Sequence, residues 1–219
     1  MPRLLFEKKG SAVWISHLDL MRLFQRAFKR AGLLLTHTQG FNPRPSVSIA
    51  LPLSVGVESS CELLDFDLCG DPVSDAEIRD RLNDALVDGV RVLEVYDNGR
   101  KLRDLSLLRC AVSLEYDAGV LEGAVERLKG FFAADSIVVP KRTKNGVQDQ
   151  DIIPMIRQIM ITLKDENTIQ IEALVCCQNP TLNPMQISAA IDLHLPDLKA
   201  DFASCRRIEI YDSQEMIFR

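Results

Sequence analysis

The stretch WISHLDLMRLFQRAFKRAGLLLTHTQGFNPRPSVSIALPL, residues 14–53, decides the expected fold, because it combines one long helix with one polar loop. Ser16 precedes a run of apolar residues at helical spacing. Asp19 follows Ser16 by three residues, which is the S-x-x-D spacing of a capping box at the start of a helix. The apolar residues that then recur at helical spacing are Leu20, Leu23, Phe24, Ala27, Phe28 and Ala31. Gly32 supplies a C-terminal stop. The pattern predicts a helix over residues 16–31 that buries this face.

The other face of the same helix is basic. Its Lys and Arg residues are Arg22, Arg26, Lys29 and Arg30. Residues 1–50 hold eight Lys and Arg against two Asp and Glu, whereas residues 51–100 hold four against twelve, within a net charge of −5. Such an uneven distribution favours a polyanion-binding stripe. The alternative is a solvated face whose cations offset the helix dipole.

The loop that follows is restrained by its own residues. Gly40 permits a positive φ, and Pro43 and Pro45 fix φ and push the preceding Asn42 and Arg44 toward extended geometry. This restraint predicts a loop that holds Asn42 and Arg44 in one geometry. Asn42 would then be a fixed polar side chain that recognises a base edge or a sugar.

Two aromatic residues in this stretch allow two interpretations each. Phe41 is interpreted as an anchor of the loop into the core, and the alternative is a stacking surface for a base. Trp14 is interpreted as a packing residue at the core or the cap, in preference to a base platform.

Three segments resemble a known family: SHLDLMRLFQRAFKRAG, GFNPRPSVSIALPLSVGVES and, later, KRTKNG followed by DIIP. They are similar to the radical-SAM-linked protein family, a bacterial domain of unknown function encoded beside, or fused to, a radical-SAM protein. Asp151 and Pro154 match the family's pattern in the last segment. Arg44 replaces the histidine of the family's usual GFNPHP, which argues against a mechanism that needs a histidine there. The resemblance implies a radical-SAM partner.

Composition narrows the class of protein. The sequence of 219 residues contains no apolar run near the ~18 residues that a membrane span needs, and charged residues interrupt its N-terminus, so we expect a cytoplasmic protein without membrane contact. The cysteines are Cys61, Cys69, Cys110, Cys176, Cys177 and Cys205. They lack C-x-x-C or zinc-finger spacing and the C-x-x-x-C-x-x-C motif of radical-SAM enzymes. We therefore expect reduced core cysteines, no metal and no cofactor.

The periodicities predict an α+β fold of two tandem ferredoxin-like (βαββαβ) units, residues 1–98 and 107–219, with antiparallel sheets covered by helices on one face. In the first unit the strands are expected at 3–9, 46–51, 61–68 and 90–96, with helices at 16–31 and 74–87. In the second unit the expected strands are 108–116, 158–163, 168–175 and 206–211, with helices at 120–133 and 184–193. Residues 52–59 are expected to form a turn region and residues 141–151 a polar loop.

The two polar loops occupy the same place in their units. A pseudo-twofold packing would bring Lys141, Arg142 and Lys144 beside Arg44 and the helix stripe in one basic field. The alternative is two ordinary solvated connections.

These observations give three function hypotheses. The first is an RNA-binding accessory module that works with a radical-SAM enzyme in RNA modification or processing, with tRNA or rRNA as the RNA and no activity of its own. Its phosphate contacts would be Arg22, Arg26, Lys29, Arg44, Lys141, Arg142 and Lys144. The second is a metal-independent RNA-processing or RNA-modifying enzyme that uses His17 and His37 as acid and base. The third is a protein–protein adaptor for the radical-SAM partner that does not contact RNA.

Overall fold

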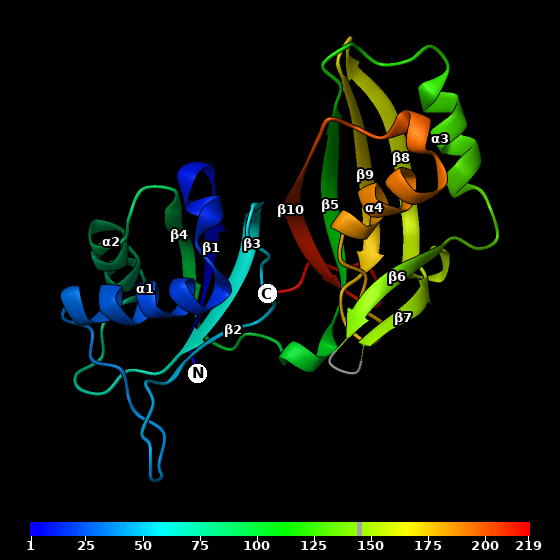
Figure 1. The fold of residues 1–219 in the computed structure, drawn as a ribbon. Coiled ribbons are helices and arrows are strands. Elements are labelled where there is room, and N and C mark those ends of the chain that lie inside the picture. Colours follow the sequence, from blue (N-terminus) through cyan, green and yellow to red (C-terminus); the bar gives the residue numbers. More distant parts are fainter. Residues whose placement is uncertain (144–145) are drawn as a thin grey trace. The chain divides into compact units, whose positions relative to one another are not determined.

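The computed structural model describes residues 1–143 and 146–219, which form two units of mixed helices and antiparallel strands (Figure 1). Unit 1 comprises Met1–Leu102 together with Arg219, and unit 2 comprises Arg103–Phe218. The division between Leu102 and Arg103 lies within the linker expected between residues 98 and 107.

Unit 1 follows the chain order β-α-β-β-α-β. Its elements are β1 (Arg3–Lys8), the short 3₁₀ helix η1 (Gly10–Trp14), α1 (His17–Arg30), β2 (Val47–Ile49), β3 (Val57–Phe66), α2 (Asp75–Ala85) and β4 (Val90–Tyr96). The strands lie in the order β4-β1-β3-β2, and each neighbouring pair is antiparallel.

The core of unit 1 lies between this sheet and its two helices. Phe24 and Phe28 of α1 are fully buried, as the apolar periodicity predicted. The Phe24 ring lies 4.7 Å from that of Phe6 on β1, and the Phe28 ring lies 5.1 Å from that of Phe66 on β3, between centroids. Leu82 of α2 belongs to the same buried cluster, so both helices pack on one face of the sheet.

The predicted capping box at the start of α1 is confirmed. The backbone N–H of Asp19 donates to Ser16 Oγ over 3.2 Å, and the Ser16 hydroxyl donates to the Asp19 carboxylate over 2.8 Å. Leu23, predicted to be buried, is only partly buried and packs at the margin of the core. The buried stripe is therefore narrower than the apolar pattern, because the sheet covers only the side of α1 that carries Leu20, Phe24 and Phe28.

Unit 2 contains a main sheet and a separate β-ribbon. Its elements are β5 (Leu105–Glu115), α3 (Ala124–Phe132), β6 (Val138–Thr143), β7 (Gly146–Asp151), β8 (Ile156–Asp165), β9 (Thr168–Cys176), α4 (Met185–His194) and β10 (Phe202–Asp212), with short 3₁₀ helices η2 (Leu102–Asp104, across the division), η3 (Ile153–Met155) and η4 (Pro196–Leu198). The main sheet has the order β10-β5-β9-β8 with antiparallel neighbours. Thus, counting the main-sheet strands along the chain, each unit has the order fourth, first, third, second.

The helices of unit 2 also share a face of their sheet. The ring centroids of Phe131 on α3 and His194 on α4 are 5.7 Å apart. Leu128 of α3 and Ile187 of α4 are fully buried together with Ile171 of β9. The helices therefore cover one apolar side of the sheet.

Two segments differ from the sequence prediction. Residues 57–59 were expected in a turn region, but they belong to β3, in which Ser59 pairs with Lys8 and is fully buried. Residues 141–151 were expected to form a polar loop, but β6 pairs with β7 across this segment. Backbone hydrogen bonds hold that ribbon, and they form between polar residues as readily as between apolar ones.

Candidate nucleic-acid interface

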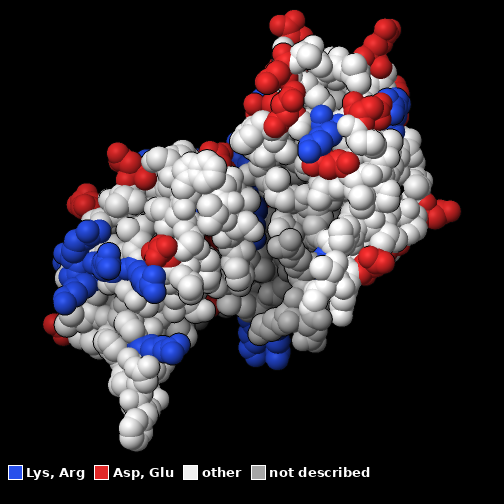
Figure 2. All heavy atoms as spheres, viewed as in Figure 1, with Lys and Arg blue, Asp and Glu red and all other residues white. Residues whose placement is uncertain are grey.

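The candidate interface in unit 1 begins with the exposed face of α1. Figure 2 shows Lys and Arg side chains gathered over this helix. Arg22, Arg26 and Lys29, the three α1 residues predicted to contact phosphates, are all exposed. The helix also places Lys29 and Arg30 in its last turn, where cations offset the negative end of the helix dipole.

The basic side chains of α1 are not equivalent. Arg22 Nη1 lies 2.8 Å from Asp19 Oδ1 in an exposed ion pair, so part of its charge is neutralised. The hydrogen bond from Ser16 and the guanidinium of Arg22 lower the pKa of Asp19 below its ordinary value, which keeps the partner ionised. Arg30 donates to the carbonyl oxygen of Ala85 on α2. Arg26 and Lys29 form no ion pair with any residue that the structure describes. They are therefore the stripe's available charges.

A hollow of about 450 Å³ lies beside the stripe, between the C-terminal ends of α1 and α2. Arg30, Arg81 and Asp84 contribute to its lining. Arg81 is paired with Glu77 and Arg30 donates to the carbonyl oxygen of Ala85, so the two helix C-termini and the Asp84 carboxylate make this hollow unfavourable for an anion. A bound polyanion would instead follow the outer face that carries Arg26 and Lys29.

The second part of the interface is the loop between Leu35 and Val47, which projects from unit 1 beyond α1 and β2 (Figure 1). Ser46 N donates to the carbonyl of Thr36 over 2.9 Å. Further out, Thr38 N donates to the carbonyl of Arg44 over 2.8 Å, and Arg44 N donates to Thr38 Oγ1 over 3.0 Å. The loop therefore has a paired stem, which supports the predicted restraint on Asn42 and Arg44.

The residues at the tip of this loop point to solvent. Gly40 has a φ of +136°, a positive value that a glycine permits. Asn42 and Arg44 are exposed, and neither side chain has a hydrogen bond or ion pair within the described parts of the chain. Arg44 is the basic residue of the loop, and its backbone pairs with Thr38 in the stem, next to the tip.

The preferred interpretation of Phe41 was wrong, and so was a core position for Trp14. Phe41 does not anchor the loop, because its relative exposure is 111%. Trp14 is not a core residue either: it is 69% exposed and lies beside Gly56 at the end of η1. The residues beside Phe41 could have indicated its exposure. Gln39, Gly40 and Asn42 provide no apolar neighbour that would enter a core together with it.

The structure does not bring His17 and His37 together. His17 lies two residues after Ile15, whose carbonyl oxygen accepts from Lys8 Nζ, and Lys8 is the residue of β1 that pairs with Ser59. His37 follows Thr36, whose N–H donates to the carbonyl of Asp67 beyond the other end of β3. From Ser59 to Asp67 an extended strand covers about 26 Å. One acid–base pair acting on a single phosphodiester needs both groups within hydrogen-bond reach.

The second predicted loop lies on the β-ribbon of unit 2. Lys141 Nζ donates to the carbonyl oxygen of Thr181 over 3.3 Å, so this ammonium has an internal partner. Arg142 lies on β6, and Lys144 lies outside the described residues. Arg44 belongs to unit 1 and Lys141 to unit 2, and a basic field shared by both stays a prediction.

Asp151 and Pro154, the matching residues of the last family segment, lie where the ribbon joins β8. Asp151 Oδ1 accepts from the N–H groups of Ile137 and Ile153 over 3.0 and 3.1 Å. Desolvation raises the pKa of Asp151, but these hydrogen bonds outweigh it and lower the pKa below its ordinary value. Pro154 lies in η3, directly after Ile153, whose N–H donates to Asp151. Both residues therefore act in the local structure of the ribbon.

The cysteines and other metal-binding side chains form no evident site. Cys69 is exposed, contrary to the expectation of core cysteines, whereas the other five are buried and free. Burial raises the pKa of Cys177 and of Cys205 to about 12, so their thiols stay protonated. Among the described residues, no three His, Cys, Asp or Glu side chains gather as a metal site would need. Within the same residues, no helix is both long enough and apolar enough to cross a membrane.

The chain is thus a two-unit α/β protein with antiparallel sheets and an exposed basic face on unit 1. It belongs to the bacterial family described as "Uncharacterized protein conserved in bacteria (DUF2344)", whose model matches residues 2–184. No match was found among curated proteins.

The solved structures that match this chain include the following two. A chain in the "Crystal Structure of a Cbf5-Nop10-Gar1 Complex" shares its fold with a TM-score of 0.55 and 9% identity, over 95% of this chain and 48% of that chain. The protein therefore spans about half the length of that chain. The "Crystal Structure of an Unknown Protein from Galdieria sulphuraria" aligns over 94% of this chain and 96% of that chain, with 11% identity and a TM-score of only 0.26.

Proposed function

We propose that this protein is an RNA-binding accessory module that works in the cytoplasm with a radical-SAM enzyme in the modification or processing of RNA, with tRNA or rRNA as the bound RNA. The observation that carries the proposal is the pairing of two features on unit 1. Arg26 and Lys29 form no ion pair with the residues that the structure describes, and the projecting loop presents Arg44, Asn42 and Phe41 to solvent. Phosphates, base edges and base faces are the groups that such side chains bind in RNA.

The uneven charge supports a polyanion in preference to a generic acidic or basic partner. The chain as a whole carries −5, yet the outer face of α1 is basic. On α2 the arginines are instead paired: the partly exposed Arg79 with Asp80, and the exposed Arg81 with Glu77. An RNA backbone would therefore be attracted to α1 and to the loop and repelled from the acidic surface of α2.

The strand order supports a finer description of the fold. We propose that both units are ferredoxin-like, because each has four antiparallel main-sheet strands in the same order with two helices on one face. Sheets of this kind host many functions, so the RNA proposal rests on the α1 and loop side chains and not on the fold.

The enzyme alternative has less support. The separation of His17 from His37 along β3 would leave each histidine to act alone at a different end of unit 1. A metal-free cleavage assay with bulk tRNA tests it: loss of activity in both His17→Ala and His37→Ala would favour an enzyme, and intact RNA with wild-type protein would favour a module without its own activity.

The adaptor alternative rests on a specific surface. Trp14 and Leu18 are 69% and 66% exposed near the start of α1, and Val55, next to Gly56, is 51% exposed. Exposed aromatic and aliphatic side chains of this kind favour protein contacts. If Trp14→Ala abolished co-purification with the radical-SAM protein and no RNA bound, the adaptor hypothesis would replace the RNA proposal.

Salt dependence separates RNA binding from adaptor function. We expect the affinity for bulk tRNA to fall steeply with salt, and Arg26→Ala to flatten the log–log slope by roughly 0.7–0.9, the contribution of one phosphate contact. Arg22→Ala should flatten it less, because Asp19 already neutralises part of that charge. Fluorescence anisotropy at several salt concentrations measures both slopes.

The matched control for this experiment is Arg79→Ala, which removes a partly exposed, ion-paired arginine from α2. It should leave the slope unchanged. Equal effects of Arg79→Ala and Arg26→Ala would show that only overall charge matters and would remove α1 as the site.

A further inference from the structure

Phe41 is an exposed aromatic side chain that the phosphate contacts do not explain. It lies at the tip of the loop between Leu35 and Val47, and none of its side chain is covered. Burying a Phe side chain contributes about 2–3 kcal/mol to folding or binding, and the free protein leaves this contribution unused. The residue is thus available to a ligand.

The loop holds this side chain on a paired stem. The contacts of Ser46 with Thr36 and of Arg44 with Thr38 close the stem on the inner side, and Pro43 and Pro45 restrict the chain beside the tip. A tip that is already ordered loses less conformational entropy when it binds. The paired stem therefore favours a loop tip that binds a ligand. A loop that only connected α1 to β2 would not need such a stem.

The neighbours of Phe41 favour a nucleobase as the ligand. Gln39 and Asn42 carry amide groups that can both donate to and accept from a base edge, and Arg44 follows with a cation for a phosphate. A loop that enters a lipid surface would carry several apolar residues, and here Phe41 is flanked by Gly40 and Asn42. An aromatic ring with amide and guanidinium neighbours matches the three chemical parts of an unpaired nucleotide.

We propose that Phe41 stacks on an unpaired base, so that the RNA bound by this protein is single-stranded or looped at the contact. This inference rests on the proposed function, since it names the kind of RNA that the α1 face and loop receive. A continuous duplex keeps its base faces inside the stack, where a loop tip has no access to them. The α1 cations bind the backbone of either form.

The test compares Phe41→Ala with wild type on two probes: a single-stranded RNA of about twelve nucleotides, and the same RNA annealed to its complement. Stacking on one base is worth about 1–3 kcal/mol, so Phe41→Ala should weaken single-strand binding roughly 5- to 150-fold and duplex binding much less. Phe41→Trp should retain binding and Phe41→Leu should not, because leucine is apolar without being a stacking surface. Quenching of 2-aminopurine in the single strand should disappear in Phe41→Ala.

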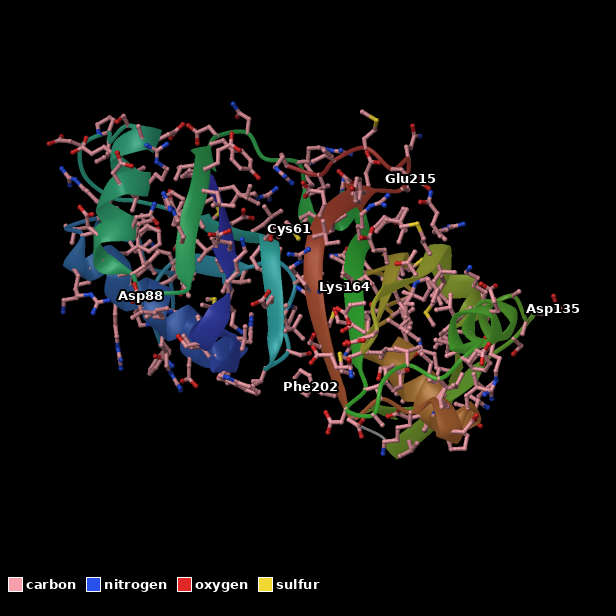
Figure 3. The ribbon with its side chains drawn as sticks, turned by 90° about the horizontal axis from the view of Figure 1, so that it is seen from above. Cys61, Asp88, Asp135, Lys164, Phe202 and Glu215 are labelled. Carbon is pink, nitrogen blue, oxygen red and sulfur yellow. The ribbon has the colours of Figure 1, made fainter. Side chains whose placement is uncertain are left out.

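Phe202→Ala is the matched control, since Phe202 at the start of β10 in unit 2 is also exposed, at 55% (Figure 3). It should leave binding to both probes unchanged. If Phe41→Ala bound the single strand as wild type does while Arg26→Ala weakened both probes, stacking would be refuted and RNA binding would stand. If wild type bound neither probe, both proposals would fail. Phe41-dependent binding to anionic phospholipid vesicles without RNA binding would identify the tip as a membrane contact and overturn the stacking proposal.

Discussion

Phe28→Ala should lower the free energy of unfolding by about 3–5 kcal/mol, the usual cost of truncating a buried phenylalanine. Phe28 is fully buried in α1, and its ring lies 5.1 Å from that of Phe66 on β3. The truncation removes the contact that holds the basic helix against its sheet and leaves a cavity between them. For a unit of about a hundred residues, the melting temperature should fall by more than about 10 °C.

The control for this prediction is the same substitution at an exposed position. Phe41→Ala should change the free energy of unfolding by less than about 0.5 kcal/mol, because Phe41 contacts no core. Urea denaturation followed by circular dichroism measures both variants. Losses of similar size at the two positions would show that α1 is not packed on the sheet through Phe28.

Arg3→Ala should be of similar severity, at about 3–5 kcal/mol, because it leaves the Asp65 carboxylate without its partner in a largely buried place. Arg3 on β1 is only 4% exposed, and its Nε and Nη2 lie 2.5 and 3.1 Å from the two oxygens of Asp65 on β3. Its Nη1 also donates to the carbonyl oxygen of Arg100 over 2.8 Å. The guanidinium therefore fastens β1, β3 and the segment after β4.

Two further variants make this prediction specific. Arg22→Ala breaks an exposed pair with Asp19 and should cost no more than about 1 kcal/mol. Replacing both buried partners, Arg3→Met with Asp65→Leu, should cost less than Arg3→Ala alone, because no unpaired charge remains. If Arg3→Ala and Arg22→Ala cost the same, the buried pair has no structural importance.

The parts of unit 1 that depend on local signals could be predicted from the sequence. The capping box at Ser16 and the spacing of Phe24 and Phe28 are short-range patterns, and they located α1 to within one residue at each end. The pairing of Arg22 with Asp19 follows from the same local rule, since residues three apart on a helix are neighbours. That pairing should have lowered the expected contribution of Arg22 to the stripe.

Features that depend on distant parts of the chain could not be predicted in the same way. The extension of β3 to Ser59 depends on pairing with Lys8 of β1, which no local pattern reports. The β6–β7 ribbon forms between polar strands whose sequence lacks the apolar alternation of a half-buried strand. The exposure of Phe41 depends on where the loop stem directs its tip, and composition alone does not distinguish an anchoring ring from an exposed one.

Ultraviolet cross-linking of the full chain to RNA in bacterial cells, with mass spectrometry of the RNA-linked peptides, tests the central claim most directly. The account predicts cross-links in the loop of residues 36–46 and on the exposed face of α1, with the loop cross-links lost in Phe41→Ala. Absence of RNA-linked peptides from the wild-type protein, or cross-links confined to Arg103–Phe218, would contradict the claim that unit 1 presents the RNA-binding surface.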